Sequence, residues 1–274
     1  MPRVASCGLT TLDLVQYVEH LPGPDEKVQA REARVEFGGP AANAAFTARA
    51  VGVQSRLITC LGTGPLSGAV REQLIGSGVE VIDVAAGHGW QPPVSSVAVT
   101  DQGRSVISVN AATSSATTLP DGALDGCGAL LVDGHHLALA VDAATTARLA
   151  GIPVLLDGGS WKPGLERLVP LVDSAVISAD FHPPEAVAWG DRPVAVTQGH
   201  REIHYRQGPD QGTIEVDAVP DAETLGAGDV FHGAWLAHVG RFGLHDFAGG
   251  LRFAARIAAL SCRYPGAHDW AEHL

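Results

Sequence analysis

From residue 128 onward, short apolar runs alternate with helical patterns, and this order constrains the fold more than any other feature of the chain. Apolar runs of strand length lie at 128–134, 152–159, 174–180 and 192–199. Helical patterns at 138–151 and 164–173 separate the first three of these runs, and a hairpin pattern follows at 201–219. Because parallel strands are joined by crossovers that usually contain a helix, this order predicts a doubly wound, mostly parallel α/β sheet with helices on both faces.

The first half of the chain has a different pattern. Segments that alternate apolar and polar residues, as half-exposed strands do, lie at 28–37, 95–101 and 104–110. Such strands do not suit a parallel sheet that is covered on both faces, so we expect a small β-strand lid formed by approximately 14–37 and 92–110. The whole chain, 1–274, then forms a single α/β domain. Ligands of open α/β sheets bind beyond the carboxyl ends of the strands, where such a lid would close.

Composition limits the classes of function. A chain of 274 residues with 46% hydrophobic content can bury one large core. A net charge of −12 argues against a nucleic-acid partner and against an anionic membrane surface, because both require a basic patch. The four cysteines are far apart in the sequence, no apolar run approaches the length of a membrane span, and the first residues do not resemble a signal peptide. We therefore expect a soluble protein of the cytoplasm.

The stretch ETLGAGDVFHGAW, at 223–235, carries the strongest chemical signal. Gly226, Ala227 and Gly228 lead into Asp229, and a helical pattern begins there. Unpaired N–H groups at the start of a helix bind anions, and a carboxylate beside them can act on what is bound. Taken alone, however, such a turn most often serves only packing.

A second group of residues strengthens the functional interpretation of this turn. Gly38 and Gly39 follow a lid strand, Asn43 lies in the first turns of the next helix, and Asp13 follows the first core strand. An acid and an amide at the two ends of a closing lid suit a ligand with several hydroxyl groups, because each can bond to neighbouring hydroxyls.

Together these residues resemble the ribokinase-like (PfkB) family of carbohydrate kinases, and the resemblance extends over essentially the whole chain. The family's Gly-Gly-x-x-x-Asn signature corresponds to 38–43, and its Asp-Thr-x-Gly-Ala-Gly-Asp signature corresponds to 223–229, where Glu223 replaces the usual aspartate. The resemblance implies that Asp229 removes the proton of a sugar hydroxyl, while the N–H groups of 226–228 face the phosphoryl oxygens of ATP. It implies further ligand contacts, which for the sugar are Asp13, Gly38, Gly39 and Asn43, and for the nucleotide Thr197, Gly199, Ser178 and Thr224.

The implied cofactors are ATP and Mg²⁺, with room for a monovalent cation. The family often carries Asn-x-x-Glu after a late core strand to place magnesium through water. This chain has Ser178-Ala179-Asp180 there, with Glu185 further on, so Asp180 and Glu185 are the weaker candidates for that role. Lids of this family often pair between subunits, which implies a homodimer through the lid.

A finer resemblance, to the sulfofructose kinases within the family, concerns the charge of the substrate. Lys27 and Asn110 occupy the positions of two residues that bind the sulfonate there, but His135 replaces the arginine. An imidazole binds a sulfonate less well than a guanidinium does, which favours a neutral sugar. Lys27 is equally well explained as a solvated lysine in a turn.

Two other classes of function remain open from the sequence. One is a sugar-binding regulator without catalysis, against which the intact Gly-Ala-Gly-Asp argues. The other is a nicotinamide-dependent dehydrogenase, which shares the parallel sheet. Against it, Phe231 occupies the position of the third glycine in the dinucleotide fingerprint.

Overall fold

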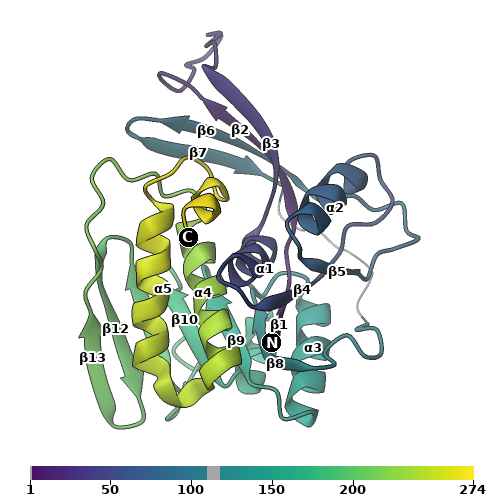
Figure 1. Ribbon diagram of the computed structural model, residues 1–274, viewed down its shortest axis with the longest axis vertical. Coiled ribbons are helices and arrows are strands. Elements are labelled where there is room, and N and C mark those ends of the chain that lie inside the picture. The colour runs from purple at the N-terminus through teal and green to yellow at the C-terminus, as the bar shows by residue number, and fades with distance from the viewer. Residues whose placement is uncertain (1, 110–117) are drawn as a thin grey trace.

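The computed structural model describes residues 2–109 and 118–274. Within these residues the body is a nine-stranded sheet (Figure 1). Its strands in spatial order are β13 (Asp210–Ile214), β12 (Arg201–Gln207), β11 (Val194–Gln198), β10 (Ser174–Ser178), β9 (Val154–Gly158), β8 (Cys127–Val132), β1 (Arg3–Cys7), β4 (Gln54–Thr59) and β5 (Glu80–Asp83).

The sheet is parallel from β11 to β5, and β12 and β13 add an antiparallel hairpin at one edge. All five residues of β9 are buried, because helices cover both faces of the sheet. The expected doubly wound α/β fold is therefore confirmed. Strand β5 was not expected; it is four residues long and only partly buried, so it leaves little pattern in the sequence.

Helices cover the two faces unequally. One face packs against α1 (Pro40–Ala50), α2 (Ser67–Gly76), α4 (Ala227–Phe242) and α5 (Phe247–Ser261). The other face packs against α3 (Leu137–Leu149). Helices α1 and α4 approach closely at Gly233, where a β-carbon would lie 2.4 Å from the carbonyl oxygen of Ala44. This contact places the first turns of the two helices side by side.

The α-helix expected at 164–173 is wrong. The structure has two short 3-10 segments there, Leu165–Arg167 and Val169–Leu171. Pro170 explains the difference, since it lacks an N–H and its ring clashes with the carbonyl of the preceding turn of an α-helix.

The lid is a separate four-stranded sheet, in the order β3 (Glu32–Gly38), β2 (Thr11–Tyr17), β6 (Val94–Thr100) and β7 (Gly103–Ser108). Strand β2 begins four residues after β1 ends, so the lid stands at the carboxyl ends of the parallel strands (Figure 1). The C-terminal segment, yellow in Figure 1, reaches the lid, where Arg34 Nη1 donates to Asp269 Oδ2 at 2.8 Å. In the described part of the chain, no helix has the length and apolarity that a membrane span requires.

Candidate active site

The glycine-rich turn is held from two sides by Glu223. Its Oε1 accepts hydrogen bonds from the backbone N–H of Gly266, at 2.9 Å, and from the hydroxyl of Tyr17 in the lid, at 3.3 Å. Gly226 then caps the start of α4 with φ of 72°, a left-handed conformation that favours glycine. The replacement of aspartate by glutamate at 223 thus gives a longer side chain that joins the turn, the C-terminal segment and the lid.

Asp229 lies in the first turn of α4 and faces α1. Asn43 Nδ2 donates to Asp229 Oδ2 at 2.7 Å, and Asn43 Oδ1 lies 3.0 Å from His268 Nε2. Because an amide oxygen can only accept, His268 donates to it, which fixes the orientation of the Asn43 amide.

His268 was not found by sequence reasoning. It lies in the C-terminal segment between two aromatic rings, with its centroid 4.0 Å from that of Phe37 and 4.7 Å from that of Phe46. Its Nδ1 lies 3.6 Å from Glu36 Oε2, on lid strand β3. No motif distinguishes this histidine in the sequence, since only the fold brings the C-terminus to α1.

The pKa of Asp229 lies close to neutral pH. Burial raises its pKa to about 7, and Asp157 adds to the increase, whereas the hydrogen bond from Asn43 and the charge of His232 oppose it. The residue as a whole is partly exposed. A carboxylate whose pKa lies close to the working pH is well suited to general-base catalysis.

The residues expected around a sugar lie at the junction of lid and body. Thr11 Oγ1 donates to Asp13 Oδ1 at 2.6 Å, and burial raises the pKa of Asp13. A β-carbon at Gly38 would lie 2.0 Å from Asp13 Oδ2, so only glycine fits beside this carboxylate. Gly39 caps α1, the helix that carries Asn43, with φ of 94°.

The residues expected around the nucleotide line one cavity of about 600 Å³. Those that reach it are Ser178, Thr197, Gly199, Thr224, Ala227 and Gly228. The same cavity is also lined by apolar residues, which are Ile203, Val216, Val219, Phe231, Ala255, Ala258 and Ala259. A lining that combines polar and apolar residues suits a ligand that has phosphates at one end and a flat base at the other.

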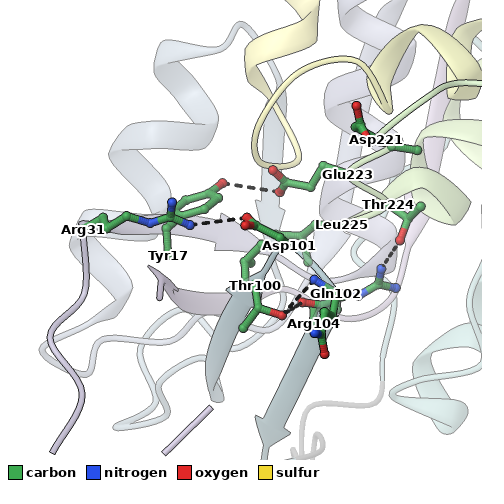
Figure 2. Close-up of a pocket in the computed structure, with 13 residues that line it drawn as sticks. Tyr17, Arg31, Thr100, Asp101, Gln102, Arg104, Asp221, Glu223, Thr224 and Leu225 are labelled. Carbon is green, nitrogen blue, oxygen red and sulfur yellow. Dashed lines mark hydrogen bonds and ion pairs between the residues drawn. The ribbon is translucent and has the colours of Figure 1, made fainter. Parts of the chain in front are cut away.

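A second cavity, of about 800 Å³, adjoins the first between the β6–β7 turn and residues 221–225. Figure 2 shows Arg104 reaching from β7 to the hydroxyl of Thr224, while Arg31 and Asp101 face each other at 3.5 Å. Arg104 lines both cavities, so it lies at the boundary between them. Sequence reasoning missed this lid arginine.

Of the residues expected around an anionic group, the structure describes Lys27 and His135, and no hydrogen bond or ion pair joins these two. Lys27 is exposed in the loop between β2 and β3, and within the described residues it makes no hydrogen bond or ion pair. Asn110 lies outside the described residues. His135 follows β8, where its backbone N–H donates to Asp133 Oδ1 at 2.8 Å, and burial lowers the pKa of its imidazole.

The candidates for a metal do not form a site by themselves. Asp180 and Glu185 are both exposed in the segment that follows β10. The described residues contain no group of three or more His, Cys, Asp or Glu side chains that could hold an ion. Carboxylates are suitable ligands for Mg²⁺, but a magnesium ion here would depend chiefly on the oxygens of its own nucleotide and on water.

Comparison with known proteins gives matches along the chain. The model of the pfkB family of carbohydrate kinases matches residues 1–180. The ribokinase of Bacillus subtilis is 22% identical over 276 aligned positions, which cover 95% of this chain and 93% of that protein. The nucleoside kinase of Methanocaldococcus jannaschii is 39% identical over 62 residues, and this match covers 23% of this chain but only 20% of that protein.

Solved structures agree over nearly the full length. A protein of Agrobacterium tumefaciens, provisionally named a ribokinase, superposes with a TM-score of 0.86 at 24% identity. The superposition covers 98% of this chain and 94% of that protein's chain. The ribokinase of Arabidopsis thaliana, solved with ribose and ATP, has a TM-score of 0.79 at 21% identity, with coverage of 98% and 95%. The fold is therefore ribokinase-like.

Proposed function

Because the chain belongs to the pfkB family of carbohydrate kinases, which are phosphotransferases with a hydroxyl group as acceptor, we propose that it transfers the γ-phosphoryl of ATP to a monosaccharide, with Asp229 as general base. The observation that carries this proposal is the cavity of about 600 Å³, which is lined by the expected nucleotide residues and by Gly228, the residue before Asp229. A nucleotide bound there would have its phosphates next to the carboxylate.

Each part of the site has a role in this reaction. The sugar hydroxyl bonds to Asp229, which takes its proton as the hydroxyl oxygen bonds to the γ-phosphorus and the bond from that phosphorus to the β-phosphate oxygen breaks, so that ADP leaves. Asp13 and Asn43 hold neighbouring hydroxyls. The N–H groups of Gly226 and Gly228, at the positive end of α4, face the oxygens of the transferred group, whereas the N–H of Ala227 donates to the carbonyl oxygen of Thr224 at 3.3 Å. Magnesium, carried by the nucleotide, supplies further positive charge when it is bound. The lid excludes water, which would otherwise accept the phosphoryl group.

The proposed substrate is a neutral sugar, and a sulfofructose kinase is the alternative. Burial lowers the pKa of His135, so its imidazole is neutral at pH 7 and has no charge to offer a sulfonate. Lys27, the remaining described residue of the expected sulfonate pocket, is exposed. The alternative therefore rests on Lys27 and on Asn110.

The lid is also the proposed dimer interface. Val35, Val106 and Ile107 are 52%, 50% and 79% exposed, and all three lie on lid strands. Exposed apolar side chains on a small sheet suit packing against a second copy of the same sheet.

The decisive experiment is ATP consumption across a panel of ketoses, aldoses, nucleosides, sugar phosphates and sulfosugars, with the products identified by mass spectrometry. Phosphorylation of a neutral ketose or aldose supports the proposal. A preference for a sulfosugar or for a nucleoside would replace the proposed substrate class. Binding of a sugar by calorimetry without any ATP turnover would show a regulator without catalysis.

A further inference from the structure

His232 is a buried histidine directly below the glycine-rich turn, one turn along α4 from Gly228. It is 5% exposed. Its Nδ1 lies 2.7 Å from the carbonyl oxygen of Gly228, and its Nε2 lies 3.1 Å from the carbonyl oxygen of Val176 in β10. Carbonyl oxygens only accept hydrogen bonds, so both ring nitrogens must donate. Among the forms of histidine, only the imidazolium has two N–H groups.

A buried counter-ion stands beside this ring. Asp157, the fourth residue of β9, is 6% exposed, and its Oδ2 lies 3.4 Å from His232 Nδ1. A buried cation without a partner would be costly, and an ionised Asp157 offsets part of that cost. Burial raises the pKa of Asp157, and the charge of His232 opposes that increase. The parallel sheet creates the pair, because β9 and β10 lie side by side and each contributes a group that faces His232 of α4.

We propose that His232 is a positioning residue for phosphoryl transfer: as an imidazolium held by Asp157, it fixes the peptide after Gly228 and supplies the positive charge that balances the carboxylates around Asp229. The effect expected on kcat rests on the proposed function. The arrangement of charges stands on the hydrogen bonds and can be measured without catalysis.

The fixed peptide matters because Gly228 and His232 both line the nucleotide cavity. Gly228 has no side chain to hold it, and a β-carbon there would meet no atom within 4 Å. The bond from His232 to its carbonyl therefore adds a restraint to a residue that no side chain of its own holds in place. A restrained turn keeps its N–H groups aimed at the phosphoryl oxygens before the substrate arrives.

The balance of charge involves every element that faces Asp229. Asp157 on β9 and Asp13 on the lid raise the pKa of Asp229, while the amide of Asn43 on α1 and the charge of His232 on α4 lower it. Asp157 in turn faces His232, Asp133, Lys162 and His135. Removing the cation and removing the anion of the pair should therefore have opposite effects on Asp229.

The test is a titration of ¹³C-labelled aspartate carboxyls by NMR on the ligand-free protein, with the Asp229 signal assigned by its loss in Asp229→Asn. We expect His232→Gln to raise the apparent pKa of Asp229, and Asp157→Asn to lower it, each by about one unit, which is typical of a nearby charge. The double variant should return close to the wild-type value. The acid limb of the kcat profile should move to higher pH in His232→Gln and to lower pH in Asp157→Asn.

His238→Gln is the matched control. His238 lies on the same helix, is 8% exposed and faces a carboxylate, with Nε2 3.1 Å from Asp246 Oδ2, yet it is remote from the turn. The Asp229 titration should be unchanged in this variant. If His232→Gln does not fold, Asp157→Asn tests the inference alone: a lowered pKa of Asp229 supports it, and a raised or unchanged pKa contradicts it. Shifts of the same sign in both variants, or no shift in either, would overturn the inference. Opposite shifts together with an unchanged pH profile of kcat would support the proposed arrangement of charges. The same result would show that Asp229 is not the general base.

Discussion

Asn43 donates a hydrogen bond to Asp229 across 2.7 Å and so joins the first turns of α1 and α4. The donation favours the ionised carboxylate and occupies Oδ2, whereas within the described residues Oδ1 of Asp229 makes no hydrogen bond. One oxygen is thus left to accept the proton of a substrate hydroxyl. His268 holds the Asn43 amide in the orientation that makes this division of the two oxygens possible.

Asp229→Asn should leave substrate binding nearly intact while kcat falls at least a hundredfold. General-base catalysis typically contributes about 10²–10⁴-fold, and an amide cannot take up the proton. Steady-state kinetics and calorimetry of sugar binding measure the two effects separately. Asp25→Asn is the control, since Asp25 is exposed in the lid loop and its positive φ of 58° suits asparagine as well. A kcat within a few-fold of wild type would remove Asp229 from the mechanism.

The same substitution should raise stability at high pH. The pKa of Asp229 is about 7 in the folded protein and close to 3.8 without its surroundings. Between these values the folded state binds more protons than the unfolded state, so the contribution of this group to stability falls as pH rises. The difference between these two pKa values corresponds to about 4 kcal/mol, and partial exposure of the residue reduces this to about 2 kcal/mol.

Thermal unfolding of wild type and Asp229→Asn at pH 4 and pH 8 measures this linkage. The variant should be the more stable protein at pH 8, and its advantage should largely disappear at pH 4. An equal difference in Tm at both values of pH would show that the carboxyl is not held in an unfavourable environment.

The parallel sheet could be predicted because each buried strand leaves a compact apolar run and each crossover leaves a helical pattern. The turn at 226–229 could be found because its glycines and acid occur together with a second signature upstream, Gly38-Gly39 followed by Asn43. The contribution of the C-terminal segment to the site could not be predicted, since His268 approaches Asn43 only after α5 has returned the chain to the lid. Arg104 was missed for the same reason, because its contact with Thr224 joins residues 120 positions apart.

Expectations failed where a single residue overrode a longer pattern. The segment at 164–173 has helical spacing, but Pro170 prevents a continuous α-helix. His232 was overlooked because one histidine within an apolar helix resembles ordinary core. Its importance comes from Asp157 and Val176, which belong to two other elements.

The two glycines of the turn should respond differently to substitution. A β-carbon at Gly228 would meet no atom within 4 Å, so Gly228→Val should fold and fill part of the nucleotide cavity. At Gly226 the φ of 72° and the Ala267 β-carbon, 3.0 Å from the added one, oppose any side chain, so Gly226→Ala should lose stability.

We expect Gly228→Val to reduce kcat with little change in Tm, and Gly226→Ala to lose about 1–2 kcal/mol of unfolding free energy, the typical cost of a left-handed conformation. Kinetics and chemical denaturation of both variants test this contrast. Gross unfolding of Gly228→Val would show that this glycine serves packing instead.

Ile107→Glu should separate the proposed dimer into monomers, because a charge at the most exposed apolar side chain of the lid would be buried on pairing. Light scattering after size exclusion gives the molar mass of wild type and variant. Leu149→Glu is the control, since Leu149 is 87% exposed at the end of α3, far from the lid. A wild-type chain that remains monomeric at high concentration would exclude the lid interface.

Lys27→Ala separates the two proposed substrate classes. If the lysine contacts an anionic group, its loss breaks a charge pair, which costs about 2–5 kcal/mol when the pair is desolvated. The Michaelis constant for a sulfonated or phosphorylated ketose should then rise tenfold or more, since each ~1.4 kcal/mol is a factor of ten, while that for a neutral sugar should hardly change. Because Lys27 is exposed in the isolated chain, such a contact requires movement of the lid loop or the approach of a second subunit. Kinetics at several protein concentrations distinguish these two routes, since only the second depends on association. Equal effects on neutral and anionic sugars would make Lys27 a surface residue and would end the sulfonate alternative.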